Sequence, residues 1–531
     1  MIRASAGIGL LAFIAGVAYA QPAAAPPTFD IADVHVSAPT TNPYARGGVI
    51  RGGRYELRTA TLVDLIRIAY EVDADKIIGG PNWLEADRFD VIAKAPAETA
   101  PDTARQMLQT LLADRFKLVI HKDSKPLSVF VLSLGKGKPK LKEADGSGNA
   151  GCQGVPQNPQ PGTIPNAIVN CRGVTMEVFA RTLPQMAGAY ITTTVLDQTG
   201  LKGSWDFTLE WTARALLTFA GDHAITIYDA VDKQLGLKLE SKTVPTPVVV
   251  VDTVNRAPTE NPPGVTQKIP PPPPAEFEVA DIRPSRPDAT QPMGRIQNGR
   301  IDAQALPLKQ LIMIAWNINS NDELMAGMPK WADSARFDLV AKVSTSGPAQ
   351  DVDIDALRTM LQKLLVDRFQ MKTHMENRPV TAYTLVAAKP KLKKADPSNR
   401  STCKRGPMPG TKDPRDANPA LSQIFTCLNT TMSEFAEQLP NLSGDYIQTP
   451  VVDKTELEGA WDFTVSFSPR GLLMGLPNRG GDASQQAASD PSGALSLFDA
   501  VNKQLGLKLE KEKRPLPVLV IDHIEEKPTD N

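Results

Sequence analysis

The stretch DAVDKQLGLKLE at residues 229–240 returns as DAVNKQLGLKLE at residues 499–510, with a difference at one position. Upstream, residues 175–211 align with residues 431–467 without a gap and share 19 identities in 37 positions. Self-similarity of this extent indicates that one structural unit occurs at least twice in the chain. We therefore expect the fold to consist of two tandem copies of one structural unit.

Two copies are predicted, at residues 28–255 and 276–527, from matching motifs at both ends of the aligned region. The segment between them, residues 256–275, contains a run of five prolines. Proline runs adopt extended polyproline II, so this segment is predicted to be a semi-rigid spacer. Copy two also carries an insertion rich in glycine, serine, alanine and glutamine around residues 472–494, which predicts a surface loop.

Four amphipathic helices are predicted in each copy, because apolar residues recur at intervals of three and four. In copy one the helices carry Leu62, Leu65, Ile66, Ala69 and Tyr70; Met107, Leu108, Leu111 and Leu112; Met176, Phe179 and Leu183; and the segment from Thr226 to Gly236. Short β-rich runs occur at residues 129–132, 205–209 and 248–251, and residues 191–254 are predicted as strand, turn, strand, helix, strand, strand. Each copy is therefore predicted to be α+β, with two small helix-on-sheet modules that separate near the cysteines.

Residues 1–20 have the pattern of an export signal, with Arg3, an apolar run and a small-residue cleavage site at Ala18–Ala20. The apolar run is shorter than the roughly 20 residues that span a bilayer, and no later run of that length follows. We expect a periplasmic or secreted mature chain without a transmembrane segment.

The four cysteines are divided equally between the copies. In an oxidising compartment they predict one structural disulfide per copy, Cys152 with Cys171 and Cys403 with Cys427. A metal or redox role is the less favoured alternative, because no C-x-x-C spacing is present. No metal and no cofactor is expected.

Charge and motifs exclude several classes of function. The 58 basic and 59 acidic side chains give a net charge of −1, whereas a protein that binds nucleic acid by counterion release normally has a basic surplus. The sequence has no G-x-S-x-G nucleophile elbow, no P-loop and no dinucleotide fingerprint. We therefore assign no catalytic residue and expect no nucleic-acid partner.

Two histidines, His121 and His374, occupy equivalent positions in the two copies. Each is interpreted as a polar side chain near the end of a strand, with a ligand or general base as the less favoured alternative. Asp229 and Asp499 follow Thr and Ser at the spacing of a capping box, which predicts a structural role at a helix N-terminus.

Two further motifs carry a family resemblance: V-x-D-x-T-G-L-x-G-x-W-D-F at residues 195–207, and P-V-x-V-x-D at residues 247–252. Together with residues 229–240, they resemble a soil-associated family of exported proteins that is abundant in acidobacterial genomes and has no assigned function. The resemblance covers both copies and implies no catalytic residue. In copy two Glu456 replaces the turn glycine Gly200, which we interpret as a different turn geometry.

The order of elements is similar to that of the small N-terminal modules of secretins and TonB-dependent receptors, which bind partner proteins in the periplasm. The leading hypothesis is a non-enzymatic protein-binding or envelope-associated module, whose two copies would add avidity across the linker. The alternative is an extracytoplasmic hydrolase that acts on glycan, cell-wall or peptide substrates. A structural envelope protein is a third possibility, and the sequence leaves enzymatic activity open.

Overall fold

The computed structural model describes residues 25–38, 44–146, 150–155, 164–272, 276–289, 292–297, 300–318, 322–343, 354–408, 411–474 and 493–529. The predicted signal at residues 1–20 and most of the insertion at residues 472–494 lie outside the described residues. Helices account for 27% of the residues and strands for 40%, which confirms the α+β class.

The first half of copy one, unit one (residues 31–134), is a four-stranded sheet with strand order β1-β5-β3-β2 and two main helices. Its elements are β1 (Ile31–Val36), β2 (Arg46–Arg51), β3 (Arg54–Thr61), α1 (Leu62–Tyr70), β4 (Ile77–Gly79), β5 (Arg88–Lys94), α2 (Pro101–Arg115) and β6 (Val119–Leu134). Side chains from both helices and from β3 and β5 form one apolar core.

The second half of copy one, unit two (residues 142–253), repeats that topology with strand order β7-β11-β9-β8. Its elements are β7 (Lys142–Glu143), β8 (Gly151–Gly154), β9 (Asn166–Val174), α3 (Met176–Met186), β10 (Val195–Asp197), β11 (Trp205–Thr212), the short α4 (Leu217–Ala220), α5 (Ile227–Leu235) and β12 (Leu237–Thr253). Each copy is thus itself a pair of units with one topology, which the sequence comparison did not reveal.

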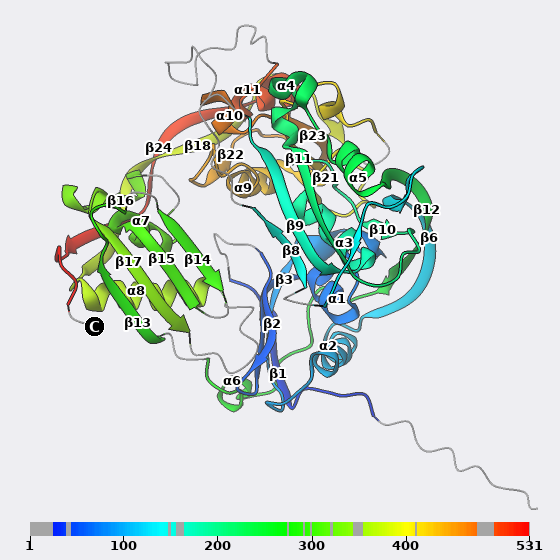
Figure 1. Cartoon of the computed structure of the whole chain (residues 1–531). Helices are drawn as coiled ribbons and strands as arrows, with labels where there is room; N and C mark the ends of the chain where they lie inside the picture. Colours follow the sequence, from blue (N-terminus) through cyan, green and yellow to red (C-terminus); the bar gives the residue numbers. More distant parts are fainter. Residues whose placement is uncertain are drawn as a thin grey trace, which may run out of the picture.

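Copy two has the same two sheets, with strand orders β13-β17-β15-β14 and β19-β23-β21-β20. Unit three (residues 277–387) contains β13 (Phe277–Pro284), β14 (Met293–Gln297), β15 (Arg300–Pro307), α7 (Leu308–Ala315), β16 (Met325–Ala326), β17 (Arg336–Val343), α8 (Ile354–Arg368) and β18 (Lys372–Ala387). Unit four (residues 393–523) contains β19 (Lys393–Lys394), β20 (Thr402–Arg405), β21 (Gln423–Thr431), α9 (Met432–Leu442), β22 (Val451–Asp453), β23 (Ala460–Phe467), α10 (Arg470–Met474), α11 (Leu497–Ala500) and β24 (Leu507–His523). Figure 1 shows the four units, with unit three at the left and unit four at the top.

A local motif common to all four units explains how each sheet leads into its first helix. A residue with positive φ stands two positions before the helix N-cap, and its backbone N–H donates to an aspartate on the neighbouring strand at 2.8–3.0 Å. The pairs are Thr59 with Asp90, Gly173 with Asp206, Ala305 with Asp338, and Asn429 with Asp462. Each carboxylate satisfies an N–H that the β-bulge removes from the ladder, so these recurrent aspartates are structural.

The two units of a copy share a long antiparallel ribbon. In copy one β6 pairs with β12 along its whole length, β10 adds in parallel to the end of β6, and β4 adds in parallel to the end of β12. As a result Val249 and Val251 of β12 lie in the core of unit one, and Leu132 of β6 lies in the core of unit two. The last strand of each unit therefore completes the core of the other unit, which we call strand exchange.

The ribbon corrects one prediction and extends another. The two β-rich runs expected after the fourth helix are the single strand β12. The modules divide in sequence between residues 134 and 142, shortly before Cys152, but the shared ribbon joins them in space. Pro126 and Pro245 stand directly opposite each other at mid-ribbon. Proline lacks an N–H, but where the ribbon has only two strands its N–H position faces outward, so no ladder bond is lost.

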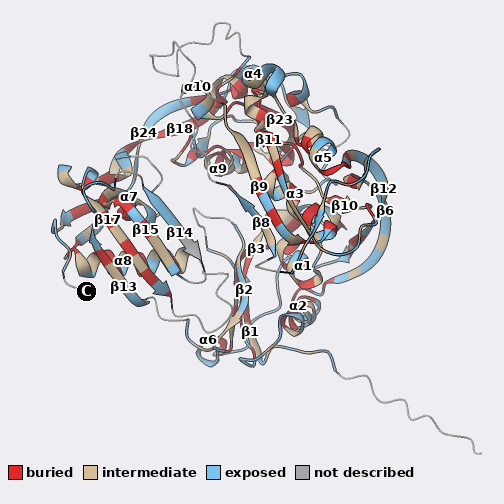
Figure 2. Ribbon diagram, viewed as in Figure 1, coloured by how far each residue is buried: buried red, intermediate tan, exposed pale blue. Residues whose placement is uncertain are grey.

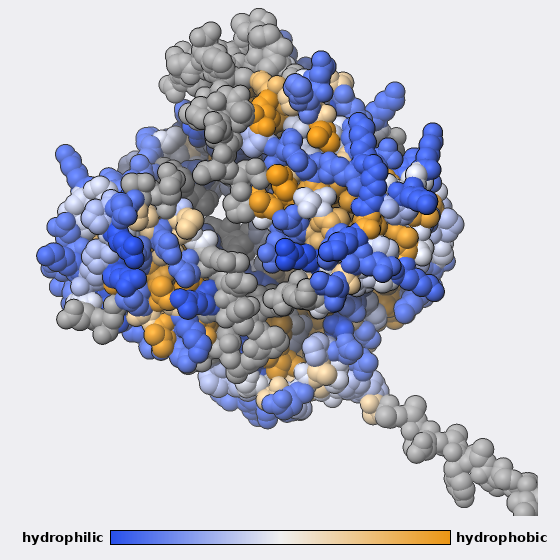
Figure 3. Space-filling view, viewed as in Figure 1, coloured by the Kyte–Doolittle hydropathy of each residue, from blue (hydrophilic) through white to orange (hydrophobic). Residues whose placement is uncertain are grey.

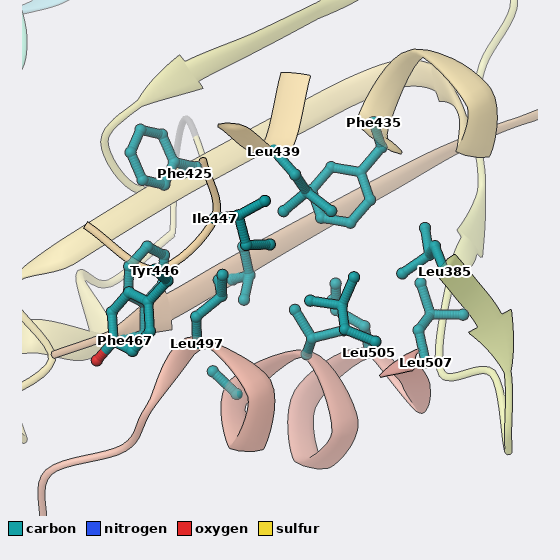
Figure 4. Close-up of a cluster of buried hydrophobic side chains, with 14 of the residues drawn as sticks. Leu385, Phe425, Phe435, Leu439, Tyr446, Ile447, Phe467, Leu497, Leu505 and Leu507 are labelled. Carbon is teal, nitrogen blue, oxygen red and sulfur yellow. The ribbon is translucent and has the colours of Figure 1, made fainter. Parts of the chain in front are cut away.

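The predicted helices are confirmed, although α2 and α7 begin after Ala100 and Pro307, which provide no side-chain cap. Thr226 and Ser496 accept from the N–H groups of Asp229 and Asp499, as the capping pattern requires. Buried residues alternate with exposed ones along the strands (Figure 2). Figure 4 shows the core of unit four, where α9, α11 and the strands contribute aromatic and leucine side chains.

The interpretation of Glu456 is wrong, because the turn keeps its geometry. Gly200 has φ +69° and Glu456 has φ +58°, so both residues have the left-handed backbone conformation. A non-glycine residue tolerates this region at a modest cost when nothing crowds its Cβ, and nothing lies within 4 Å of the Cβ position at Gly200.

Both predicted disulfides are confirmed. Cys152 and Cys171 face each other on β8 and β9, and Cys403 and Cys427 face each other on β20 and β21. Each bridge fastens an edge strand to the interior of its sheet. Disulfides of this kind fit a chain that works outside the cytoplasm.

The linker predicted as a semi-rigid spacer is attached to unit one over the part of it that is described. The N–H groups of Asn255 and Thr259 donate to the carbonyls of Phe116 and Arg115 at the end of α2, both at 2.8 Å. The Asn261 carboxamide bonds both the N–H and the carbonyl of Val34 on the edge strand β1. The linker therefore folds back onto unit one.

The Arg115 side chain connects the linker to β1 through hydrogen bonds. Its guanidinium is 7% exposed and donates to the carbonyl of Ala32, to the hydroxyl and carbonyl of Thr259, and to the side chain of Asn261. The sequence contains a repeated motif at the residues that attach the linker to unit one. The run Pro-Thr-Glu-Asn at residues 258–261 returns as Pro-Thr-Asp-Asn at residues 528–531, so each copy extends beyond its predicted end.

Candidate functional site

The two copies contact each other through charged side chains. Arg400, beside β20 of unit four, donates to the carbonyls of Ile77 and Gly79 on β4 of unit one and to the carboxylate of Glu85. Lys404 binds the same carboxylate at 2.7 Å. These cations cap the outer edge of β4, which would otherwise be an unpaired strand edge.

A second charged contact joins unit two to unit four. Arg214 is 5% exposed and pairs with Asp413 at 3.3 Å and with Asp416 at 2.5 Å. The fully buried Arg415 holds Asp413 from the other side at 2.7 Å. Buried ion pairs of this geometry fix relative orientation, because breaking one leaves an uncompensated charge. The two copies are thus docked on each other through fixed contacts.

Burial alone would raise the pKa of Glu85, yet Lys404 and Arg400 hold it below the usual glutamate value. The pKa of Asp413 is likewise lowered by Arg415 and Arg214 against the effect of burial. A carboxylate with a lowered folded-state pKa stabilises the fold above its unfolded pKa, near 4, and that contribution is lost as the pH falls through the folded value.

We therefore expect the contact between the copies to weaken as the pH falls below about 4. Thermal unfolding of Glu85→Gln at pH 7 should show a loss of about 1.5–3 kcal/mol, typical of hydrogen bonds to a charged group, and a smaller further loss on acidification. Glu98→Gln, at an exposed position of unit one, is the matched control. An acid profile unchanged by Glu85→Gln would contradict this role.

An open cleft of about 740 Å³ lies where units one and two meet beside Lys404 of unit four. Its lining mixes polar and charged side chains with aliphatic ones, and consists of Asp73, Ala74, Asp75, Lys76, Glu177, Arg181, Pro184, Gln185, Thr192, Thr193, Thr194, Val195, Leu196, Asp197, Gln198 and Lys404. The floor is pinned by Thr194, whose N–H and hydroxyl donate to the Asp75 carboxylate at 2.8–3.1 Å. Lys404 is the one lining residue of the described cleft that comes from copy two, and it reaches the cleft because the copies are docked.

One wall of the cleft is a stripe along α3. Glu177, Arg181 and Gln185 follow at intervals of four residues and therefore lie on one side of the helix. Within the described chain these three side chains make no hydrogen bond or ion pair with another residue. They are available to a ligand in the cleft, and they offer a carboxylate, a guanidinium and a carboxamide. Copy two has Ser433, Glu437 and Asn441 at the same places, so the stripe is not duplicated.

The structure gives each predicted histidine an aspartate partner. His121 Nδ1 lies 2.9 Å from the Asp252 carboxylate, and His374 Nδ1 lies 2.8 Å from that of Asp522. Both pairs are half-exposed on the ribbon, in agreement with polar positions on strands. Each stands in its own copy, and neither lines the cleft on α3.

No metal site is found in the part of the chain that can be examined: no three His, Cys, Asp or Glu side chains lie close enough to hold an ion among the described residues. Within those same ranges, no helix is both long enough and apolar enough to cross a membrane. Hydrophilic side chains cover most of the face of the molecule drawn in Figure 3.

Fold and site together define a duplicated α+β protein with an open cleft in copy one, beside which Lys404 of copy two lies. A family model described as "Protein of unknown function (DUF3738)" matches residues 63–254 and residues 309–524. The two matches cover more than half of the chain, so the protein belongs to this family, and each falls within one copy, which confirms the tandem duplication. No curated protein and no solved structure matches the chain.

Proposed function

We propose that this protein is an exported, non-enzymatic binding protein that holds a polypeptide partner of the cell envelope in the cleft beside α3. The observation that carries the proposal is the stripe of Glu177, Arg181 and Gln185, which faces an open cleft without using its hydrogen-bonding groups internally. Carboxylate, guanidinium, carboxamide and threonine hydroxyl groups match the donors and acceptors of an extended polypeptide. The described lining includes no aromatic side chain, and aromatic side chains are common in small-molecule pockets.

Export is part of the proposal, and it rests on the signal pattern of residues 1–20 and on two disulfides. Affinity would come from a site shared by both copies and not from two tethered sites, because the linker is attached to unit one. The cleft contains side chains of unit one, unit two and unit four, so binding is expected to require docked copies.

The test is a crosslinking pull-down of the tagged, mature chain from its own cell envelope, with the captured proteins quantified by mass spectrometry. Arg181→Glu reverses a charge on the cleft wall and should lower recovery of the partner at least about 5-fold, equivalent to about 1 kcal/mol. Glu437→Arg makes the opposite change on the equivalent helix of copy two, outside the cleft, and should leave recovery unchanged. Equal recovery with both variants would refute the assignment of the cleft.

A second candidate, an extracytoplasmic hydrolase, is favoured by one observation. A histidine oriented by an aspartate through Nδ1 has the geometry of a general base, and both copies have such a pair. No serine, threonine or cysteine donates to Nε2 of either histidine in the described structure, so the nucleophile would have to be water. Cleavage of envelope glycans or peptides that is lost in the double variant His121→Ala, His374→Ala would establish this candidate.

A further inference from the structure

We propose that the outer face of the β13-β17-β15-β14 sheet in unit three binds an extended, proline-rich segment of a partner polypeptide. The inference rests on the proposed binding function and adds a second site with its own chemistry. It comes from comparing one face of the sheet in units one and three, which have the same topology but different surroundings.

In unit one the chain's own linker covers the Arg54 end of that face, while Lys94 in the middle of the sheet stays 47% exposed. The short helix α6 (Val265–Lys268) contacts β1, and both Val265 and Ile269 are buried. Arg54 on β3 donates to the carbonyl of Pro270 at 2.7 Å. The Arg54 side chain is only 10% exposed, although it projects from the face opposite the core. This face therefore binds an apolar segment that ends in proline.

Unit three presents the same row of side chains across its strands. In unit one Ile31, Lys94 and Arg54 stand side by side on β1, β5 and β3. The equivalent row in unit three is Val279, Lys342 and Arg300 on β13, β17 and β15. An aliphatic residue, a lysine and an arginine recur in the same order.

The row is open in unit three. Arg300 is 60% exposed where Arg54 is 10% exposed, and Val279 is 62% exposed where Ile31 is half-buried. No described segment of the chain lies over this sheet as the linker does over unit one, and in Figure 1 its strands face the viewer. Figure 3 shows apolar side chains between hydrophilic ones in this region.

The chemistry of the site favours a proline-rich occupant. The arginine guanidinium provides donors, so the ligand must bring a free backbone carbonyl, and a proline-rich chain keeps its carbonyls unpaired because it forms no internal ladder. Polyproline II is extended before it binds, which reduces the conformational entropy lost on docking. An aliphatic residue in a short helical turn five positions before the proline, as Val265 of α6 stands before Pro270, would cover Val279.

The test uses the full-length mature chain and a fluorescein-labelled peptide with the sequence of residues 260–272, ENPPGVTQKIPPP. Fluorescence anisotropy should show saturable binding at one site per chain. Arg300→Ala and Val279→Lys, both at exposed positions, should each weaken binding about 10-fold or more, the effect of losing one hydrogen bond to a charged group or a small apolar contact. Arg54→Ala is the matched control in unit one and should leave the affinity unchanged.

Absence of saturable binding would overturn this inference, and so would binding that is lost with Arg54→Ala but kept with Arg300→Ala, since the peptide would then be displacing the linker. Thermal unfolding shows whether Arg300→Ala and Val279→Lys are folded. If one of them is not, the peptide affinity of the other variant decides whether the inference holds. Failure here leaves the cleft proposal standing, because Arg181→Glu and its envelope partner are measured separately. Failure of the cleft test likewise leaves peptide binding at Arg300 intact.

Discussion

Replacing Gly506 with alanine is expected to lower the free energy of unfolding of unit four by about 3 kcal/mol or more. Gly506 ends the last helical turn with φ +68°, where an L-residue with a Cβ costs roughly 1 kcal/mol. A Cβ at this position would also lie 1.7 Å from the carbonyl oxygen of Lys389. That oxygen belongs to backbone held in place by the N–H groups of Ala388 and Lys389, which both donate to Gly506.

Gly200→Ala is the matched control, because it separates the backbone cost from the steric clash. Gly200 has the same left-handed conformation, but nothing lies within 4 Å of its Cβ position. It should therefore cost only about 1 kcal/mol. Urea unfolding followed by tryptophan fluorescence measures both variants. Equal losses for Gly506→Ala and Gly200→Ala would show that the turn at Lys389 can move away.

Neither unit of a copy is expected to fold alone, whereas residues 25–272 should form a folded copy one. A fragment of residues 25–135 lacks β12, and with it Val249 and Val251 of its own core and the strand that pairs with β4. Two buried valines account for about 3–4 kcal/mol, and the lost pairing of β4 adds to this. Small domains have only about 5–15 kcal/mol of stability in total, so little or none would remain.

Cooperative unfolding by urea and dispersed amide resonances distinguish the outcomes. We expect both for residues 25–272 and neither for residues 25–135. A fragment of residues 136–272 should fail in the same way, because Leu132 of β6 lies in its core. Cooperative unfolding of either half would mean that strand exchange within a copy is dispensable.

Much of the fold follows from local sequence rules that these elements obey. The duplication, the four main helices of each copy and the disulfide pairs were predictable, because the caps, the apolar spacing and the cysteine positions are all local patterns. Thr226 with Asp229 is an example in which a four-residue pattern fixed the start of a helix that the structure contains.

The strand exchange was not predictable from such patterns. The prolines at residues 126 and 245 argue locally against a continuous strand, and they are tolerated only because each faces the other across a two-stranded ribbon. The attachment of the linker left a signal, the repeated Pro-Thr-x-Asn, but nothing in it identifies Arg115 as the buried partner. The same holds for Arg400 and Glu85, which lie 315 residues apart in sequence.

The site was beyond sequence reasoning for a related reason. The cleft is assembled from side chains of three units, and its distinctive residues, such as Arg181, occur in one copy only. Comparing copies reveals what they share, which is the scaffold. Residues that differ between the copies give the copies different surfaces, and both Lys404 and the stripe on α3 belong to this class.

The most direct test of binding at the cleft is site-specific photo-crosslinking in the native cell envelope, with benzoylphenylalanine placed at position 181 on α3 or, for comparison, at position 437 on α9. Both positions are exposed on equivalent helices, so general exposure to the envelope is the same. The proposal predicts that position 181 crosslinks a small, reproducible set of envelope polypeptides that position 437 does not. Identical crosslinks from both positions, or none from position 181, would contradict it.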